Sequence, residues 1–132
     1  MIGCVVLAGV REHLKSAGEF FEAGVEHYDK GRRSGSSMLM REGCEKVFHA
    51  YTEAVSALVQ KKGFPEPGSH AERRRALDKL RERKLAKIGD EAFLYLHSYA
   101  YYGGEIFPEV DKCLKDVDEA IRYVNRKIGK TP

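Results

Sequence analysis

Apolar residues recur at intervals of three and four along most of the chain, a spacing that places them on one face of an α-helix. The first stripe predicts a helix over residues 11–30, formed by Leu14, Ala17, Phe21, Gly24, Val25 and Tyr28. The second predicts a helix over residues 38–62, formed by Cys44, Val47, Phe48, Tyr51, Val55, Leu58 and Val59. Between the two helices, "KGRRSGSS" contains Gly31 and Gly35, which we expect to end the first helix.

The third stripe is thinner and lies on a highly charged segment. Ser69 and Glu72 fit the S-x-x-E capping box, so a third helix is predicted over residues 70–87. Its apolar positions are Leu77, Leu80, Leu85 and Ile88. Gly89-Asp90 can end that helix and cap a short one over residues 91–102.

A last helix is predicted over residues 108–128, with Pro108 in its first turn. Its face consists of Val110, Cys113, Leu114, Val117, Ile121, Val124 and Ile128. Acidic residues come early in this segment and basic residues late, which complements the helix dipole. No segment after residue 10 alternates as a strand does, so the sequence predicts an all-α, antiparallel up-and-down bundle of four to five helices.

The first ten residues, "MIGCVVLAGV", are apolar but too short to span a bilayer, and they lack the basic start of a signal peptide. We expect residues 1–10 to form a packed or extended N-terminal arm, and a start codon placed too far upstream would give the same pattern. Residues 11–132 are then a single domain. The chain has an odd number of cysteines, which are widely spaced: Cys4, Cys44 and Cys113. This argues against a disulfide framework and a zinc site and predicts a reducing, cytoplasmic location. We expect no association with a membrane.

Positive charge is concentrated in the third predicted helix. Residues 70–87 carry a net charge of +5, whereas the whole chain carries +3. Such a segment can bind the phosphates of a nucleic acid or nucleotide, and Arg73, Arg74, Arg75 and Arg81 are the candidate ligands. The alternative is a solvated helix face with ion pairs between residues four apart.

Metal and nucleophile chemistry find little support in the sequence. Glu45, His49 and Glu53 recur every four residues, but no second helix supplies the Glu-x-x-His pattern of a bundle metal site. Cys44 and Cys113 fall on core stripes, where a thiol behaves as a small hydrophobic group. We therefore expect no metal and no cofactor.

The stretch "LYLHSYAYYGGE" places His97 on the apolar face of the short helix, with Tyr101 one turn later. A histidine in such a place is usually a hydrogen-bonded core residue. Alternatively, His97 and Tyr101 line a polar pocket beside the basic helix, where the imidazole could carry a proton or contact a phosphate.

Three segments, "FFEAGVEHYDKG", "GCEKVFHAYTEAVSALVQKKGFP" and "AFLYLHSYAYYGGEIFPEVDKCLKDVDEAIRYV", resemble the archaeal PaREP-type proteins, which look like members of the HEPN (higher eukaryote and prokaryote nucleotide-binding) class. The resemblance covers about residues 11–128. Its motifs are a Glu-Lys pair opening the second helix and a Leu-His followed by an aromatic pair. Their residues are Glu45, Lys46, Leu96, His97, Tyr101 and Tyr102.

The resemblance implies a helical bundle, often a homodimer, and adds Glu45 and Lys46 to the candidate ligand residues. Some members of the wider class are ribonucleases, whereas others partner nucleotidyltransferases. The ribonucleases carry an Arg and a His with four to six residues between them, and no Arg stands within thirteen residues before His97. Arg41 and His49 are also too far apart, with seven residues between them.

Three hypotheses follow. The first is a non-catalytic, nucleotide- or RNA-associated bundle or the partner of a nucleotidyltransferase-type module. The second is a divergent nuclease or phosphotransfer enzyme that uses His97, and the third is a purely structural or protein-interaction dimer. We favour the first, because it rests on the family resemblance and on the net charge of +5 in residues 70–87.

Overall fold

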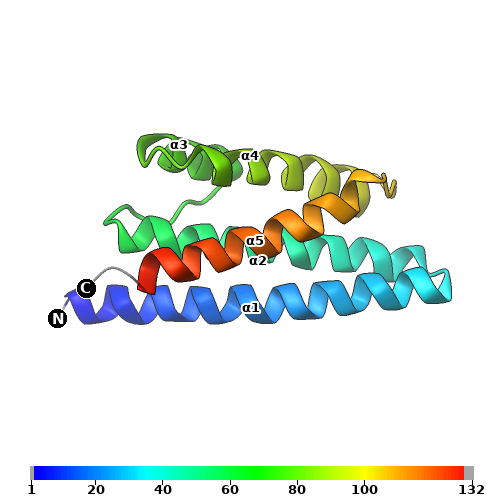
Figure 1. The fold of residues 1–132 in the computed structure, drawn as a ribbon, viewed down its shortest axis with the longest axis horizontal. Coiled ribbons are helices and arrows are strands. Elements are labelled where there is room, and N and C mark those ends of the chain that lie inside the picture. Colours follow the sequence, from blue (N-terminus) through cyan, green and yellow to red (C-terminus); the bar gives the residue numbers. More distant parts are fainter. Residues whose placement is uncertain (1, 130–132) are drawn as a thin grey trace.

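The computed structural model describes the backbone of residues 2–129 and the side chains of residues 9–129. Its helices are α1 (Ile2–Ser34), α2 (Ser37–Lys61), α3 (His70–Lys79), α4 (Arg83–Ala92), the π-helix η1 (Phe93–Tyr102) and α5 (Glu109–Gly129). The described residues contain no strand, and the helices run up and down beside one another (Figure 1). The predicted all-α bundle is confirmed.

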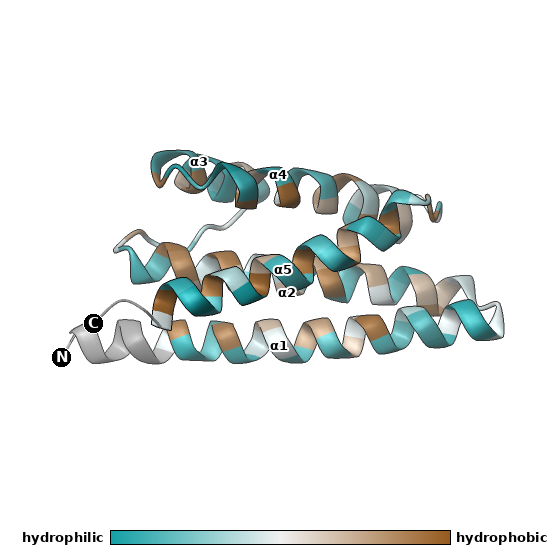
Figure 2. Ribbon diagram, in the orientation of Figure 1, coloured by the Kyte–Doolittle hydropathy of each residue, from teal (hydrophilic) through white to brown (hydrophobic). Residues whose placement is uncertain are grey.

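α2 is the central element of the bundle. It contacts α1, α3, η1 and α5. Hydrophobic and hydrophilic positions alternate along the ribbons of α2 and α5 (Figure 2). Every position of α2 from 54 to 59 is buried, including Ser56. A helix enclosed on this many sides buries a wider arc than a single stripe, which explains why small residues fill the gaps between its larger ones.

α1 and α2 approach each other closely at two glycines. A Cβ atom on Gly43 would lie 2.6 Å from the carbonyl oxygen of Gly24 and 2.6 Å from the backbone nitrogen of Tyr28. A Cβ atom on Gly24 would lie 2.9 Å from the carbonyl oxygen of Gly43. Because no larger side chain fits at either position, the two backbones meet directly.

The first helix is longer than its stripe predicts at both ends. Residues 2–10, which the pattern sets apart as an arm, are the first turns of α1, and Val10 is already in the core at 2% exposure. Gly31 does not end the helix, because it is buried against the backbone of α2. The chain reverses at Gly35, whose φ of 74° lies in the left-handed region.

The predicted third and fourth helices have the wrong boundary. The break lies at residues 80–82, where Arg81 adopts a left-handed φ of 59°. The N–H of Glu82 donates to the carbonyl of Leu77 (2.9 Å), and the N–H of Arg81 donates to that of Asp78 (3.1 Å), the two bonds of a Schellman motif. The sequence signal is the five-residue step from Leu80 to Leu85, which a helical stripe does not make.

No break occurs at Gly89-Asp90, where the pattern predicts one, and α4 continues directly into η1. Gly89 is buried beneath the ring of Tyr51, whose hydroxyl oxygen would lie 2.0 Å from a Cβ atom at that position. The same hydroxyl donates a 2.8 Å hydrogen bond to the carbonyl of Leu85. Gly89 therefore permits close packing of α4 on α2 and does not act as a helix stop.

We expect Gly43→Ala to destabilise the bundle by about 1–3 kcal/mol, because its methyl group overlaps the backbone of α1. Gly18→Ala is the matched control, since a Cβ atom there meets nothing within 4 Å. This control should gain roughly 0.5–1 kcal/mol from helix propensity. Urea unfolding followed by circular dichroism measures both changes, and equal effects at the two sites would contradict the close approach.

Candidate functional site

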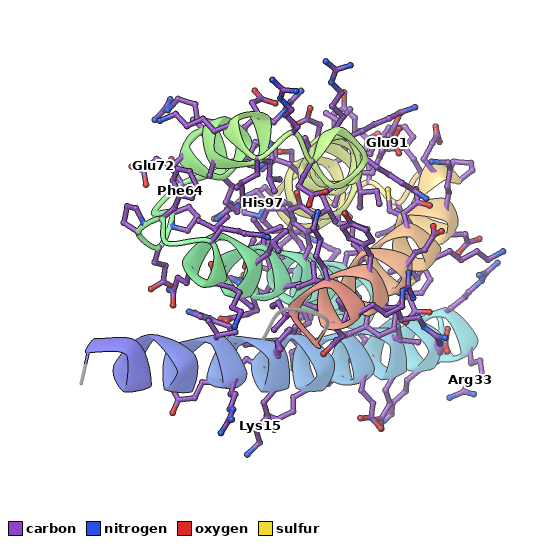
Figure 3. All side chains as sticks on the ribbon, turned by 60° about the vertical axis from the view of Figure 1, so that its left-hand side comes forward. Lys15, Arg33, Phe64, Glu72, Glu91 and His97 are labelled. Atoms are coloured by element: carbon purple, nitrogen blue, oxygen red, sulfur yellow. The ribbon has the colours of Figure 1, made fainter. Side chains whose placement is uncertain are left out.

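The centre of the site is an imidazole between η1 and α2 that is hydrogen-bonded to a carboxylate. His97 Nδ1 lies 2.7 Å from Oε1 and 3.0 Å from Oε2 of Glu45, and the two side chains are only 23% and 13% exposed. Figure 3 shows His97 between these helices. Because a carboxylate can only accept, Nδ1 carries a proton, and Nε2 is left for another partner.

A row of rings passes through His97. Phe93 stacks on His70 of α3 at 4.4 Å between centroids and lies 5.2 Å from His97. Tyr102 meets His97 edge-on at 5.0 Å. Phe48 of α2 lies 4.9 Å from the same imidazole. His97 and Tyr102 are five residues apart, which is the hydrogen-bond step of a π-helix, so the geometry of η1 brings these two rings together.

The predicted pocket shared by His97 and Tyr101 is therefore divided. Tyr102, and not Tyr101, contacts the imidazole, because the wider turn of η1 moves the neighbour of His97 from four to five residues away. Tyr101 contributes to a separate open hollow of about 380 Å³, lined by Met38, Arg41, Glu42, Tyr101 and Tyr102. Lys46, the other motif residue, is half-buried beside Glu45 on α2.

Sequence reasoning did not single out Arg41 as a candidate residue of the site. Its Nε and Nη2 donate to the carbonyl oxygen of Tyr101 at 3.2 and 2.7 Å, which fixes the guanidinium at the end of η1. The available signal was its position one helical turn before Glu45, on the same side of α2.

The four candidate arginines of the basic segment do not form one patch. Arg73 points inward, with its guanidinium 5.8 Å from the centre of the Phe48 ring, and burial lowers its pKa. Its Nε is buried without a hydrogen-bond partner in the described part of the chain. Arg74 instead donates from Nε to Asp90 at 2.9 Å. Arg75 and Arg81 are exposed to solvent, so of the four only Arg73 faces the ring row.

The Glu45, His49 and Glu53 row does not form a metal cluster. Glu45 pairs with His97, whereas Glu53 bonds to His13 of α1. His49 stacks on Phe20 at 5.7 Å. Within residues 9–129, no three His, Cys, Asp or Glu side chains are arranged to hold a metal ion.

The two cysteines whose side chains are described are buried and unbonded. Burial raises the pKa of the Cys44 thiol, and that of Cys113, to about 12. A thiol with such a pKa carries almost no thiolate at neutral pH, so neither residue can act as a nucleophile.

Fold and site together define an all-α bundle in which a carboxylate orients a histidine, and residues 9–129 contain no metal-binding cluster. The chain belongs to the archaeal PaREP1/PaREP8 family, which matches residues 12–128. No curated protein and no solved structure matches it. None of the described helices is long and apolar enough to cross a membrane.

We expect a double-mutant cycle of Glu45→Gln and His97→Gln to give a coupling of about 1.5–3 kcal/mol, because the pair is a half-buried, charge-assisted hydrogen bond. Lys84 and Glu119 form the control pair, since their side chains are 76% and 57% exposed. Their coupling should stay below about 1 kcal/mol. Chemical unfolding measures both cycles, and equal couplings would show that the Glu45–His97 contact does not fix η1.

We expect the thiols of Cys44 and Cys113 in a Cys4→Ser variant to resist a disulfide reagent at pH 8. A pKa near 12 leaves a thiolate fraction roughly a thousandfold below that of an exposed thiol. The ratio of the two thiolate fractions becomes smaller as the pH rises above the pKa of the exposed thiol. Both thiols should react within seconds once urea unfolds the chain. Rapid labelling of the folded variant would contradict the buried position of these residues.

Proposed function

We propose that this protein is a non-catalytic helical bundle that associates with RNA or nucleotides. The proposal rests on one observation, the uncompensated positive charge of the layer formed by α3 and α4. Its exposed basic residues without an ion pair to any described side chain are Arg75, Lys79, Arg81, Arg83 and Lys87.

Two pairs of these residues stand one helical turn apart, Arg75 with Lys79 on α3 and Arg83 with Lys87 on α4. Like charges at this spacing destabilise a helix by a few tenths of a kcal/mol. The alternative of a solvated face with intrahelical ion pairs accounts for Arg74, which pairs with Asp78. It does not account for the five residues that have no such partner, whereas a phosphate backbone would compensate all of them.

The resemblance to HEPN-like bundles supports an extension of this proposal. Proteins of that class work as homodimers or beside a nucleotidyltransferase, and we propose one of these two arrangements for this chain. A cytoplasmic location is part of the same proposal, because RNA and nucleotides are abundant there and Cys44 and Cys113 are unbonded.

The second candidate is a nuclease or phosphotransfer enzyme, and one observation favours it. Glu45 orients His97 as the third group of a catalytic triad orients its base. On this hypothesis, the purified protein degrades RNA and His97→Gln abolishes the activity without a loss of helicity. We rank it second because the Arg that the ribonucleases of that class carry before their His is absent from the thirteen residues before His97.

We expect Arg75→Gln combined with Lys79→Gln to weaken binding of single-stranded RNA and to reduce its salt dependence. Two lost phosphate contacts should lower the slope of log K against log salt by about 1.4. The control is Lys15→Gln with Lys30→Gln, which removes the same charge from α1; Lys15 points outward from the far side of the bundle (Figure 3). Fluorescence anisotropy of labelled RNA from 50 to 200 mM salt measures the affinity of both double variants, because ionic contacts weaken strongly over this range. The absence of any salt-sensitive binding to RNA or nucleotide would end the proposal.

A further inference from the structure

Two apolar side chains are unusually exposed at the end of the bundle where α2 begins and η1 ends. Met38 and Tyr102 are each 70% exposed, whereas no other large hydrophobic side chain among the described residues exceeds 41%. Both line the same hollow, one from each helix. Its volume of about 380 Å³ is within the range of small-ligand sites.

The Tyr102 ring is held in place although most of its surface is open to solvent. It meets His97 at 5.0 Å with an interplanar angle of 87°, and it meets Tyr101 at 5.1 Å with an angle of 76°. His97 is in turn fixed by Glu45. A ring oriented by edge-on neighbours on two sides is a preorganised surface on which a flat aromatic group can stack.

Arg41 supplies positive charge to the same hollow. Two of its N–H groups are used on the Tyr101 carbonyl, and no carboxylate pairs with it among residues 9–129. Its Nη1 faces the chain reversal at Gly104, where a Cβ atom would lie 3.4 Å away. The first turn of α2 contains no acidic residue, so the positive end of its dipole adds to this charge.

The remaining wall limits how much negative charge the hollow can accept. Glu42 is exposed and lines it, so a polyphosphate would be repelled. The same carboxylate can accept hydrogen bonds from a ribose hydroxyl or an exocyclic amine. The combination suits a flat, hydroxyl-bearing ligand that carries one anionic group.

We propose that this hollow binds a nucleoside that carries a single phosphate, with its base stacked on Tyr102 and its phosphate on Arg41. This inference deepens the proposed function and rests on it for the class of ligand. A free nucleoside monophosphate and the 5′-terminal nucleotide of an RNA share this chemistry, and the two sources are separated by experiment.

The Met38 methyl group provides a direct probe, because methyl-¹³C methionine labelling places a signal in the hollow. AMP should shift the Met38 resonance saturably while the resonance of Met40, which packs against the core, stays in place. Met38→Leu assigns the signal. Adenosine should bind about tenfold more weakly than AMP, because it lacks the charge-assisted hydrogen bonds to Arg41.

Variants separate stacking from charge. Tyr102→Ala should weaken AMP binding about tenfold or more, because the base loses its stacking partner. Tyr99→Ala is the matched control, a 41% exposed tyrosine of η1 that does not line the hollow, and it should leave the affinity unchanged. Arg41→Gln should remove the preference for AMP over adenosine, and Glu42→Gln should raise the affinity for ADP.

Oligonucleotide arms identify the source of the ligand. The ligand is an RNA end if a 5′-phosphorylated RNA shifts the Met38 resonance more strongly than its 5′-hydroxyl counterpart and does so at a lower concentration than AMP. The ligand is a free nucleotide if AMP binds more tightly than the phosphorylated RNA. A Met38 resonance that no phosphorylated ligand moves, or equal effects of Tyr102→Ala and Tyr99→Ala, overturns the inference. If RNA still binds with salt dependence in that case, the proposed function survives; if neither RNA nor AMP binds, both fail.

Discussion

The direct contact between the backbones of α1 and α2 is the constraint on which the rest of the bundle depends. Because Gly24 and Gly43 have no side chains, α1 covers one side of α2 without standing off from it. A side chain fixes another side of α2, where the Tyr51 ring occupies the space beside Gly89 of α4. With both sides fixed, the polar edge of α2 that carries Arg41 and Glu45 is left facing η1, and the candidate site is built there.

Ionisable groups serve two separate purposes in this molecule. Three histidines join pairs of segments through carboxylates, namely His13–Glu53, His70–Asp90 and His97–Glu45. These pairs are partly buried and belong to the packing of the helices. The unpaired cations of α3 and α4 contribute nothing comparable to the fold, because exposed charges without partners add little stability. We propose that a negatively charged partner compensates them on this layer.

The sequence predicted the helices because their stripes are wide and regular, as in α2 and α5. It missed the break at Arg81, where a non-glycine residue takes the left-handed conformation that normally marks a glycine. It identified His97 and Glu45 as motif residues, but their contact joins positions 52 apart and depends on tertiary packing. It placed Tyr101 one turn after His97 because the pattern assumes α-helical spacing, whereas the wider turn of the π-helix η1 brings Tyr102 to the imidazole.

We infer that this bundle holds nucleic acid or nucleotide against its α3–α4 layer and at the end of η1 that carries Tyr101 and Tyr102, without cleaving it. Ultraviolet crosslinking of the intact protein to RNA, followed by mass spectrometry of the adducts, tests it most directly. The RNA should stay intact, and the adducts should lie in peptides covering residues 75–87 and at Tyr101 or Tyr102. Adducts confined to α1, or RNA cleaved in a manner that depends on His97, would contradict it.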